Sequence, residues 1–257
     1  MTATYRLEEL WRAMRRHYPK QAGTGKLLDQ GAFSMLQRAL EKPAAERFVR
    51  PTARRWSAQV DGWLFPLDRQ RRREAMLALT YRGLVNLKSP FELALYPRLI
   101  WELQPRTIIE LGSFQGGSGL WLADQASALC ARPCAVHSFD LHHRCVSRRA
   151  RHPRLHFHRA DLSDPDSIDV EWLAKLHHPW LVIDDAHTSV LNVFLVFDRL
   201  ARRGDYYVIE DVFISVNAEV VAAGRIIEDL GWRVDTHYTD AFGYNVTCAP
   251  NGWLRKS

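Results

Sequence analysis

The chain has 257 residues, enough to bury one large core with an appendage but too few for two full enzymatic domains. It contains no apolar run of the roughly 18 residues that span a bilayer, and its Arg- and Glu-rich start does not resemble a signal peptide. We therefore expect a cytoplasmic protein without a membrane partner. The four cysteines lack the paired spacing of a zinc site, which argues against a zinc or disulfide scaffold and predicts free thiols.

The net charge of +6 is unevenly spread along the chain. Residues 1–90 hold 18 Lys and Arg against 8 Asp and Glu, whereas residues 91–257 hold 17 against 21. A basic segment can meet an anionic acceptor, an acidic carrier domain or RNA, although a solvated helical face is the simpler interpretation. The basic run at residues 69–73 has no interleaved aromatic side chains, so we do not expect a nucleic-acid partner.

The first 85 residues are predicted to form a helical extension. Apolar spacing indicates short amphipathic helices within residues 5–40 and a further helix over residues 67–79, with an irregular segment between them. We expect residues 1–85 to act as a lid or as an oligomer contact, and the protein to be a homo-oligomer.

A helix and a buried strand come next along the chain. Ser89 is suited to cap a helix that begins at Pro90 and ends near Leu103, and residues 107–111 then indicate a strand. A glycine-rich turn at residues 112–119 leads from this strand into helical spacing. Open α/β sheets bind ligands at such junctions, where glycine allows positive φ and a close approach to the backbone. The alternative is an ordinary tight turn without a ligand.

The spacing of the glycines excludes two nucleotide-binding motifs. Gly112, Gly116 and Gly117 do not match G-x-G-x-x-G, and no G-K-[ST] follows to form a P-loop. Glu110, just before the turn, suits a ligand with hydroxyl groups and a cationic centre instead. This pattern resembles that of the class I S-adenosylmethionine (SAM) dependent methyltransferases.

Predicted strands and helices alternate after the glycine turn. Strands are expected at residues 135–140, 155–159, 180–184 and 206–210, with helices at 144–149, 167–176 and 189–200. A last helix at 218–230 precedes two closing strands at 232–238 and 244–249, and residues 81–86 are predicted as a connecting loop. The alternation predicts an α/β fold over residues 86–257, with a Rossmann-like, mostly parallel sheet and an antiparallel strand near the C-terminus.

Nearly every predicted strand ends in an acidic residue. These acids are Glu110, Asp140, Asp161, Asp184 with Asp185, and Glu210 with Asp211. Carboxylates that share one rim of a sheet repel each other unless cations or hydroxyl donors compensate, which favours a functional site over simple helix caps. The first three strands suit an adenosyl ligand, with Asp140 on the ribose hydroxyls and Asp161 near the adenine.

The acids at the next two strand ends indicate a metal site. Asp184, Glu210 and Asp211 offer the hard oxygen ligands that Mg²⁺ prefers, and a bound Mg²⁺ lowers the pKa of a substrate hydroxyl. His187, three residues beyond Asp184, is a candidate general base because imidazole titrates near neutrality. The alternative is that His187 lies at a helix start and only hydrogen-bonds the loop.

Five segments together resemble a known family. They are LKSPFEL at residues 87–93, IELGSFQGGS at 109–118, IDDAHT at 183–188, VIED at 208–211 and PNGWLR at 250–255. These segments resemble the cephalosporin hydroxylase (CmcI-like) and rhamnosyl O-methyltransferase family, over about residues 85–256. The resemblance implies a SAM-binding, Mg²⁺-dependent methyltransferase that modifies hydroxyl groups of natural products, sugars or lipid glycans.

The resemblance also implies two sets of site residues. The metal ligands carried over from a D-x-D-H segment and a later E-D pair are Asp184, Glu210 and Asp211. The implied SAM site comprises Glu110, Gly112, Ser113, Gln115, Gly116, Gly117, Ser118, Asp140, Leu141, Asp161 and Asp184. Where the family usually has a second acid before the histidine, this chain has Ala186, with Asp185 one position earlier. Either His187 takes the acceptor's proton alone, or Asp185 assists.

We therefore expect a SAM-dependent, Mg²⁺-assisted O-methyltransferase that acts on a small-molecule hydroxyl in specialised metabolism, such as antibiotic biosynthesis. The basic N-terminal third would suit an anionic or carrier-bound acceptor. The alternatives are an NAD-dependent oxidoreductase, a non-catalytic SAM-binding scaffold and a nucleic-acid methyltransferase. The missing dinucleotide fingerprint opposes the first, the intact set of acids opposes the second, and the basic run without aromatics opposes the third.

Overall fold

The computed structural model describes residues 43–51, 80–212, 220 and 222–257. The chain divides into two compact units, Met1–Arg47 and Phe48–Ser257. In the first unit the structure describes the short helix α3 (Ala44–Arg47). The helices that we expect at residues 5–40 and 67–79 lie outside the described residues. The lid or oligomer contact over residues 1–85 therefore stays a prediction.

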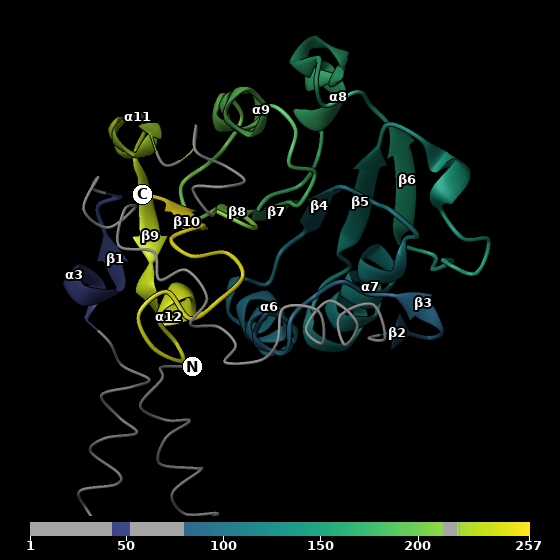
Figure 1. The fold of residues 1–257 in the computed structure, drawn as a ribbon, viewed down its shortest axis with the longest axis horizontal. Coiled ribbons are helices and arrows are strands. Elements are labelled where there is room, and N and C mark those ends of the chain that lie inside the picture. Colours follow the sequence, from purple (N-terminus) through teal and green to yellow (C-terminus); the bar gives the residue numbers. More distant parts are fainter. Residues whose placement is uncertain (1–42, 52–79, 213–219, 221) are drawn as a thin grey trace, which may run out of the picture. The chain divides into compact units, whose positions relative to one another are not determined.

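The second unit is built on an eight-stranded sheet (Figure 1). From edge to edge its strands are β1 (Phe48–Val49), β9 (Trp232–Asp235), β10 (Trp253–Lys256), β8 (Tyr206–Ile209), β7 (Trp180–Asp184), β4 (Thr107–Leu111), β5 (Ala135–Asp140) and β6 (Leu155–Arg159). The five strands from β8 to β6 run parallel, β10 runs antiparallel to both β8 and β9, and β1 runs antiparallel to β9. The predicted Rossmann-like sheet with an antiparallel strand near the C-terminus is confirmed.

Helices cover both faces of this sheet (Figure 1). One face carries α6 (Pro90–Leu103) and α7 (Gly117–Leu129), and the other carries α8 (Val170–Leu173), α9 (Val190–Asp198) and α11 (Gly224–Asp229). Because neighbouring side chains of a strand point to opposite faces, Ile108 of β4 joins the α6–α7 core whereas Ile109 joins the core under α9. None of the helices in the described part of the chain combines the length and apolar character needed to cross a membrane.

The segment that leads into the sheet follows the sequence signals closely. Ser89 caps α6, its hydroxyl oxygen accepting the Phe91 N–H at 3.2 Å, and Pro90 is the first helical residue. The helix ends at Leu103, after which Gln104 adopts a left-handed conformation with φ 53°. The helix at 90–103, the strand at 107–111 and the glycine turn into α7 are therefore confirmed.

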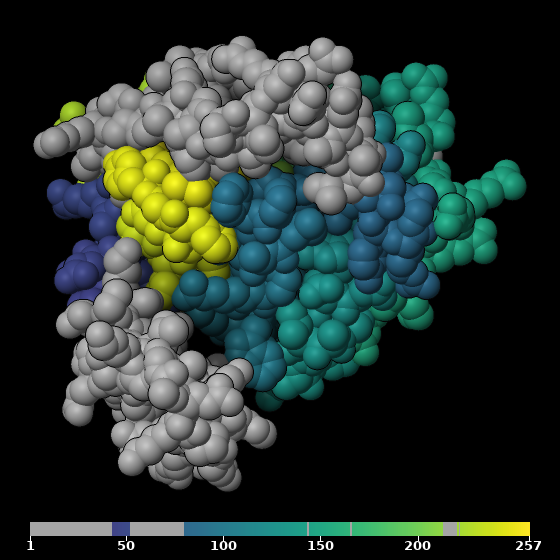
Figure 2. All heavy atoms as spheres, turned by 60° about the horizontal axis from the view of Figure 1, so that its bottom comes forward, coloured from purple at the N-terminus to yellow at the C-terminus, as the bar shows by residue number. Residues whose placement is uncertain are grey.

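The C-terminal part of the chain packs against α6, as Figure 2 shows for the yellow residues beside this helix. The Tyr238 hydroxyl donates to Glu102 at 2.8 Å, and the Arg98 guanidinium lies 5.5 Å from the centre of the Tyr238 ring. Near the start of α6, the rings of Phe91 and Phe242 are 5.1 Å apart. Both ends of α6 are thus fixed by residues more than 130 positions later in the chain.

The two closing strands differ from the prediction. Strand β9 stops at Asp235, because the Asp235 carboxylate accepts the His237 N–H at 2.9 Å and starts the short helix α12 (Thr236–Thr239). The strand predicted at residues 244–249 is wrong: this segment forms turns around Asn245, whose side-chain oxygen accepts the Thr239 hydroxyl at 3.0 Å. The strand that pairs with β8 and β9 is instead β10.

Three shorter predictions also need correction. The expected helix at 144–149 is only a 3-10 turn at His143–Cys145, and the expected loop at 81–86 contains the hairpin of β2 (Thr80–Tyr81) and β3 (Leu84–Val85). The helix at 167–176 is shortened to α8, preceded by a 3-10 turn at Pro165–Ser167. Asp169 accounts for the late start of α8, because its carboxylate accepts the Trp172 N–H at 2.8 Å and caps the helix.

Candidate active site

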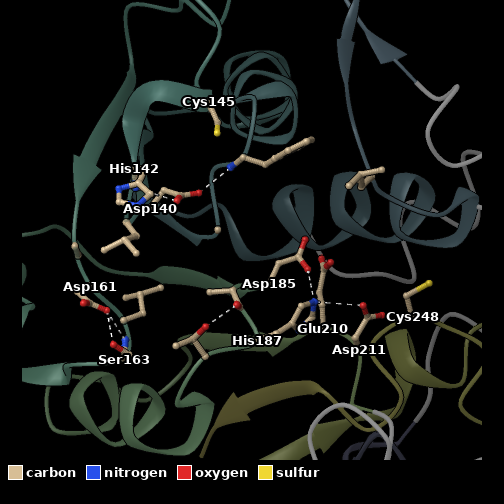
Figure 3. Close-up of a pocket in the computed structure, with 18 of the residues that line it drawn as sticks. Asp140, His142, Cys145, Asp161, Ser163, Asp185, His187, Glu210, Asp211 and Cys248 are labelled. Carbon is tan, nitrogen blue, oxygen red and sulfur yellow. Dashed lines mark hydrogen bonds and ion pairs between the residues drawn. The ribbon is translucent and has the colours of Figure 1, made fainter.

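A cavity of about 800 Å³ opens at the carboxyl ends of the central parallel strands (Figure 3). Gly112 follows β4, Asp140 ends β5, and Asp185 and Glu210 follow β7 and β8. Other lining residues include Leu87, Ser89, Glu92, Phe114, Leu141, His142, Arg144, Cys145, Asp161, Ser163, His187, Thr188, Asp211 and Cys248. Open parallel sheets bind ligands at this rim, so the cavity is where the sequence predicts a site.

Gly112 is the glycine of the turn that lines the cavity. It has φ 103°, and a Cβ there would lie 3.0 Å from the Asp185 carbonyl oxygen, so only glycine fits this conformation beside β7. Gly116 and Gly117 are needed for packing instead. A Cβ on Gly116 would lie 2.8 Å from the Phe157 ring, and one on Gly117 would lie 2.0 Å from the Val85 carbonyl oxygen.

Glu110 supports the glycine turn from beneath rather than facing the cavity. It is fully buried, and the Ser138 hydroxyl donates to its carboxylate at 2.5 Å. The Ser113 hydroxyl lies 2.6 Å from that of Ser138, and Ser118 also hydrogen-bonds the Glu110 carboxylate. Burial raises the pKa of Glu110, although these donors favour its ionised form. Glu110 therefore joins the end of β4 to the start of α7. Among the expected SAM-site residues, Glu110, Ser113, Gln115, Gly116, Gly117 and Ser118 do not line the cavity.

Asp140 and Asp161 lie together at one end of the cavity (Figure 3). The Asp140 carboxylate accepts the N–H groups of Phe114 at 3.0 Å and His142 at 3.2 Å, which aims it across the glycine turn. Asp161 accepts the Ser163 hydroxyl at 2.5 Å and its N–H at 3.0 Å. The structure thus brings together four of the residues expected around an adenosyl group, which are Gly112, Asp140, Leu141 and Asp161.

A second group of acids lies at the other end, with His187 between them (Figure 3). The His187 Nε2 atom is 3.3 Å from Asp185 and 3.4 Å from Asp211. These two carboxylates raise the pKa of His187 to about 10, so the ring is protonated at neutral pH. Oxygen and nitrogen atoms of Asp185, His187 and Asp211 lie within 4.8 Å of one another, close enough to share one cation.

Asp184 does not join this group. It is 2% exposed, and its carboxylate accepts the Tyr207 hydroxyl at 2.8 Å within the core under α9. Burial raises the pKa of Asp184 to about 7. Side chains alternate along a strand, so Asp184 and Asp185 point in different directions and only Asp185 lines the cavity. We expect Asp184 both as a metal ligand and in the SAM site; the structure places its side chain outside the cavity, and both roles stay predictions.

Lys88 and Tyr96 complete the acidic end, and we did not expect either from the sequence. The Lys88 ammonium donates to Asp185 at 2.8 Å and to Glu210 at 2.7 Å, and the Tyr96 hydroxyl donates to Glu210 at 2.5 Å. Burial alone would lower the pKa of Lys88, but the carboxylates of Asp185 and Glu210 outweigh it and raise this pKa. Lys88 belongs to LKSPFEL, one of the segments that resemble the family, and nothing local in this segment indicates which residues the lysine contacts.

The donor set at the acidic end fits a divalent cation. Carboxylate oxygens with one imidazole suit Mg²⁺ or Mn²⁺, which take few protein ligands and keep waters or substrate oxygens. Asp185, Glu210 and Asp211 all line the cavity, so such a cation would also be open to an acceptor. The residues present therefore match the requirements of a metal site. Asp185, rather than Asp184, lines the cavity beside Glu210 and Asp211.

A family model described as Rhamnosyl O-methyltransferase/CmcI matches residues 74–257, which is well over half of the chain. The chain belongs to this family. A rhamnosyl O-methyltransferase of Mycobacterium tuberculosis is 28% identical over 193 residues, covering 68% of this chain and 77% of the relative. A rhamnosyl O-methyltransferase of Mycobacterium leprae is 30% identical over 137 residues, which cover 51% of this chain and 59% of the relative.

Solved structures of CmcI support the same assignment. One, described with Mg and SAM, has a TM-score of 0.61 and 27% identity, covering 87% of this chain and 95% of CmcI. The family resemblance and the class I methyltransferase fold predicted from the sequence are thereby confirmed. As a member of the rhamnosyl O-methyltransferase/CmcI family, the chain is a SAM-dependent O-methyltransferase with a small-molecule acceptor. This excludes the NAD-dependent oxidoreductase and the non-catalytic scaffold.

Proposed function

We propose that the protein transfers the methyl group of SAM to a hydroxyl of a sugar or another natural product, with a divalent cation bound beside the acceptor. The observation that carries the proposal is the division of one cavity into two ends. Asp140 and Asp161 lie at one end, and the acids Asp185, Glu210 and Asp211 lie at the other (Figure 3). Gly112 follows β4, the strand between β5 and β7, and so lies between the two ends.

The first end is suited to the adenosyl part of SAM. Asp140 is held by two backbone N–H groups and can still accept the ribose hydroxyls, because a carboxylate has about four lone-pair sites. Leu141 and Leu162 offer apolar surface, and Asp161 lies beside them for a polar edge of the base. Gly112 lets the ligand approach the backbone where β4 ends.

The second end is suited to the acceptor. Asp185, Glu210 and Asp211 would hold the cation, which when bound lowers the pKa of a coordinated hydroxyl and fixes its position. Asp185 and His187 are the candidates for taking the hydroxyl proton. Asp185 and Asp211 raise the pKa of His187 to about 10, so the ring already carries a proton at neutral pH. It can act as a base only after losing that proton, which requires that the negative charge of the two carboxylates be compensated. The remaining contribution of the chain is orientation, which places acceptor and methyl donor in one cavity.

The names of the relatives favour a sugar hydroxyl as acceptor. The mycobacterial relatives of this chain are named rhamnosyl O-methyltransferases. An anionic or carrier-bound acceptor, a homo-oligomer and a cytoplasmic location remain predictions from the sequence, as does a role in antibiotic biosynthesis.

Calorimetry tests both ends of the cavity. SAM is titrated into the wild type, Asp140→Asn and Asp185→Asn, and Mg²⁺ is titrated into the same three proteins. We expect Asp140→Asn to lose SAM affinity and keep Mg²⁺ binding, and Asp185→Asn to show the reverse. If both variants lose the same ligand, or if the wild type binds no SAM, the two-ended site is refuted. Methyl transfer to free rhamnose and to rhamnosyl glycosides then tests the acceptor class.

A further inference from the structure

We propose that Lys88 is a resident cation of the acidic end, which competes with the divalent cation for Asp185 and Glu210 and thereby limits its affinity. This inference rests on the proposed function, because it concerns the same metal site. It assigns to Lys88 a positioning role through the two carboxylates, without contact to SAM or acceptor.

The position of Lys88 is set by the chain around it. Ser89 caps α6 immediately afterwards, and the hydroxyl of Ser89 also hydrogen-bonds Glu92 in the first turn. The Lys88 side chain is 2% exposed. Its ammonium lies 2.8 Å from Asp185, which directly follows β7, and 2.7 Å from Glu210, which directly follows β8. One buried ammonium therefore bridges two carboxylates whose strands are neighbours in the sheet.

Electrostatics make this bridge necessary while no divalent cation is bound. Glu210 is buried and the Asp185 side chain is 25% exposed. Carboxylates this close to one ammonium repel each other, and the buried one carries a large desolvation penalty when it is unpaired. Lys88 supplies one positive charge and two hydrogen bonds, and so holds Asp185 and Glu210 in place. The acidic end thus has a defined geometry before any metal arrives.

The same bridge opposes the metal. A divalent cation on Asp185 and Glu210 would lie within a few ångströms of the buried ammonium, and like charges at that distance repel each other. It must also share oxygens that Lys88 already uses. Removing the charge should therefore tighten metal binding. A lysine that only holds the fold predicts the opposite sign, because its loss would disorder the ligands and weaken binding.

Lys256 offers a matched control. Its ammonium is also largely buried, at 19% exposure, and donates to Asp198 at 2.7 Å and to the Leu230 carbonyl oxygen at 2.6 Å. Lys256 lies on β10 and does not line the cavity. Lys256→Met thus removes a paired, buried ammonium without touching the acidic end.

The experiment titrates Mg²⁺ and Mn²⁺, without SAM, into the wild type, Lys88→Met and Lys256→Met. We expect Lys88→Met to bind both cations at least about tenfold more tightly than the wild type, and Lys256→Met to match the wild type. In thermal unfolding without metal, Lys88→Met should have a lower Tm than the wild type. Added Mg²⁺ should raise the Tm of Lys88→Met by more than it raises the Tm of the wild type. If Lys88→Met does not fold, Lys88→Gln, which keeps one donor without the charge, is measured in its place.

The outcomes separate this inference from the proposed function. Unchanged or weaker metal binding in Lys88→Met, with clear binding by the wild type, overturns the role of Lys88 alone. Absence of metal binding in the wild type and in both Lys88 variants, with SAM binding retained, overturns the inference together with the metal part of the proposed function. Metal binding that appears only after Lys88 is neutralised supports the inference in its strongest form.

Discussion

Replacing Asp184 by asparagine is expected to remove a pH-dependent loss of stability. Burial raises the pKa of Asp184 from its ordinary value of 3.8 to about 7, the largest opposing effect being the hydrogen bond from Tyr207. A raised pKa in the folded state means that the folded protein binds this proton more tightly than the unfolded chain. Stability from the protonated carboxyl is therefore fully present below pH 3.8 and is lost progressively as the pH rises to about 7.

The magnitude follows from the shift of about three pKa units. Each unit corresponds to 1.36 kcal/mol, so the ionised Asp184 lowers the free energy of unfolding by about 4 kcal/mol above pH 7. Between pH 5 and pH 7 the wild type should lose about 2 to 3 kcal/mol through this group. In Asp184→Asn that part of the loss is absent, because the amide does not titrate. The other buried acids titrate equally in both proteins and cancel in the difference.

Urea unfolding at pH 5, 6, 7 and 8 measures the difference. Asp235→Asn is the matched control, because Asp235 is also buried and accepts a tyrosine hydroxyl, from Tyr206, at 2.7 Å outside the cavity. The advantage of Asp184→Asn over the wild type should grow from pH 5 to pH 7 and then stay constant. Parallel pH profiles of the two proteins would refute the buried, proton-binding role of Asp184. Mg²⁺ binding lost in Asp184→Asn and kept in Asp185→Asn would restore Asp184 as the metal ligand.

Three further predictions test the supports of the cavity. Gly117→Ala should destabilise the protein by about 1 to 3 kcal/mol in urea unfolding, because the new Cβ would meet the Val85 carbonyl oxygen at 2.0 Å. Asp140→Ala should weaken SAM binding at least about tenfold by calorimetry with little change in Tm, since a lost charge-assisted hydrogen bond costs about 1.5 to 3 kcal/mol. Tyr96→Phe should lower the free energy of unfolding by about 1 to 3 kcal/mol, because Glu210 loses a buried donor at 2.5 Å, and unchanged stability would contradict this.

The sequence was sufficient to predict the framework of the site. Alternating strands and helices predict a parallel sheet, and the acids that follow the strands must then gather at one rim. The chain places Asp140, Asp161, Asp185, Glu210 and Asp211 around one cavity at that rim. These inferences depend only on the order and direction of the strands, so they stay correct when the predicted bounds of a strand or helix are wrong by a few residues.

The direction of a single side chain could not be predicted in the same way. Asp184 and Asp185 are neighbours in the sequence, and a shift of one residue in the end of β7 exchanges the buried side chain and the cavity side chain. The family pattern pointed to the first acid, whereas the pairing of Asp184 with Ile209 of β8 keeps it within the strand. Only the register of the sheet decides between them.

Long-range polar contacts were equally hidden from the sequence. Lys88 reaches Glu210 across 122 positions, and Glu92 accepts the Thr247 hydroxyl at 2.5 Å across 155. Residues 244–249 alternate apolar and polar side chains, which locally favours a strand. They form turns instead because Asn245 hydrogen-bonds Thr239 and Thr247 hydrogen-bonds Glu92. Such contacts have no local periodicity, so composition and spacing carry no trace of them.

Backbone conformation explains why one acidic pair contributes both members to the cavity and the other contributes one. Asp184 still belongs to β7 and alternates with Asp185, but Asp211 has φ 50° and turns the chain directly after Glu210, with its N–H bonded to the Cys248 carbonyl oxygen at 2.7 Å. His187 and Phe114 also line the cavity with positive φ, at 53° and 44°. Positive φ at a residue other than glycine costs on the order of 1 kcal/mol or more. Three such residues around one cavity mean that the loops after β4, β7 and β8 are held in strained conformations that direct their side chains inward, and the well-packed sheet beneath them supplies the stability that this requires.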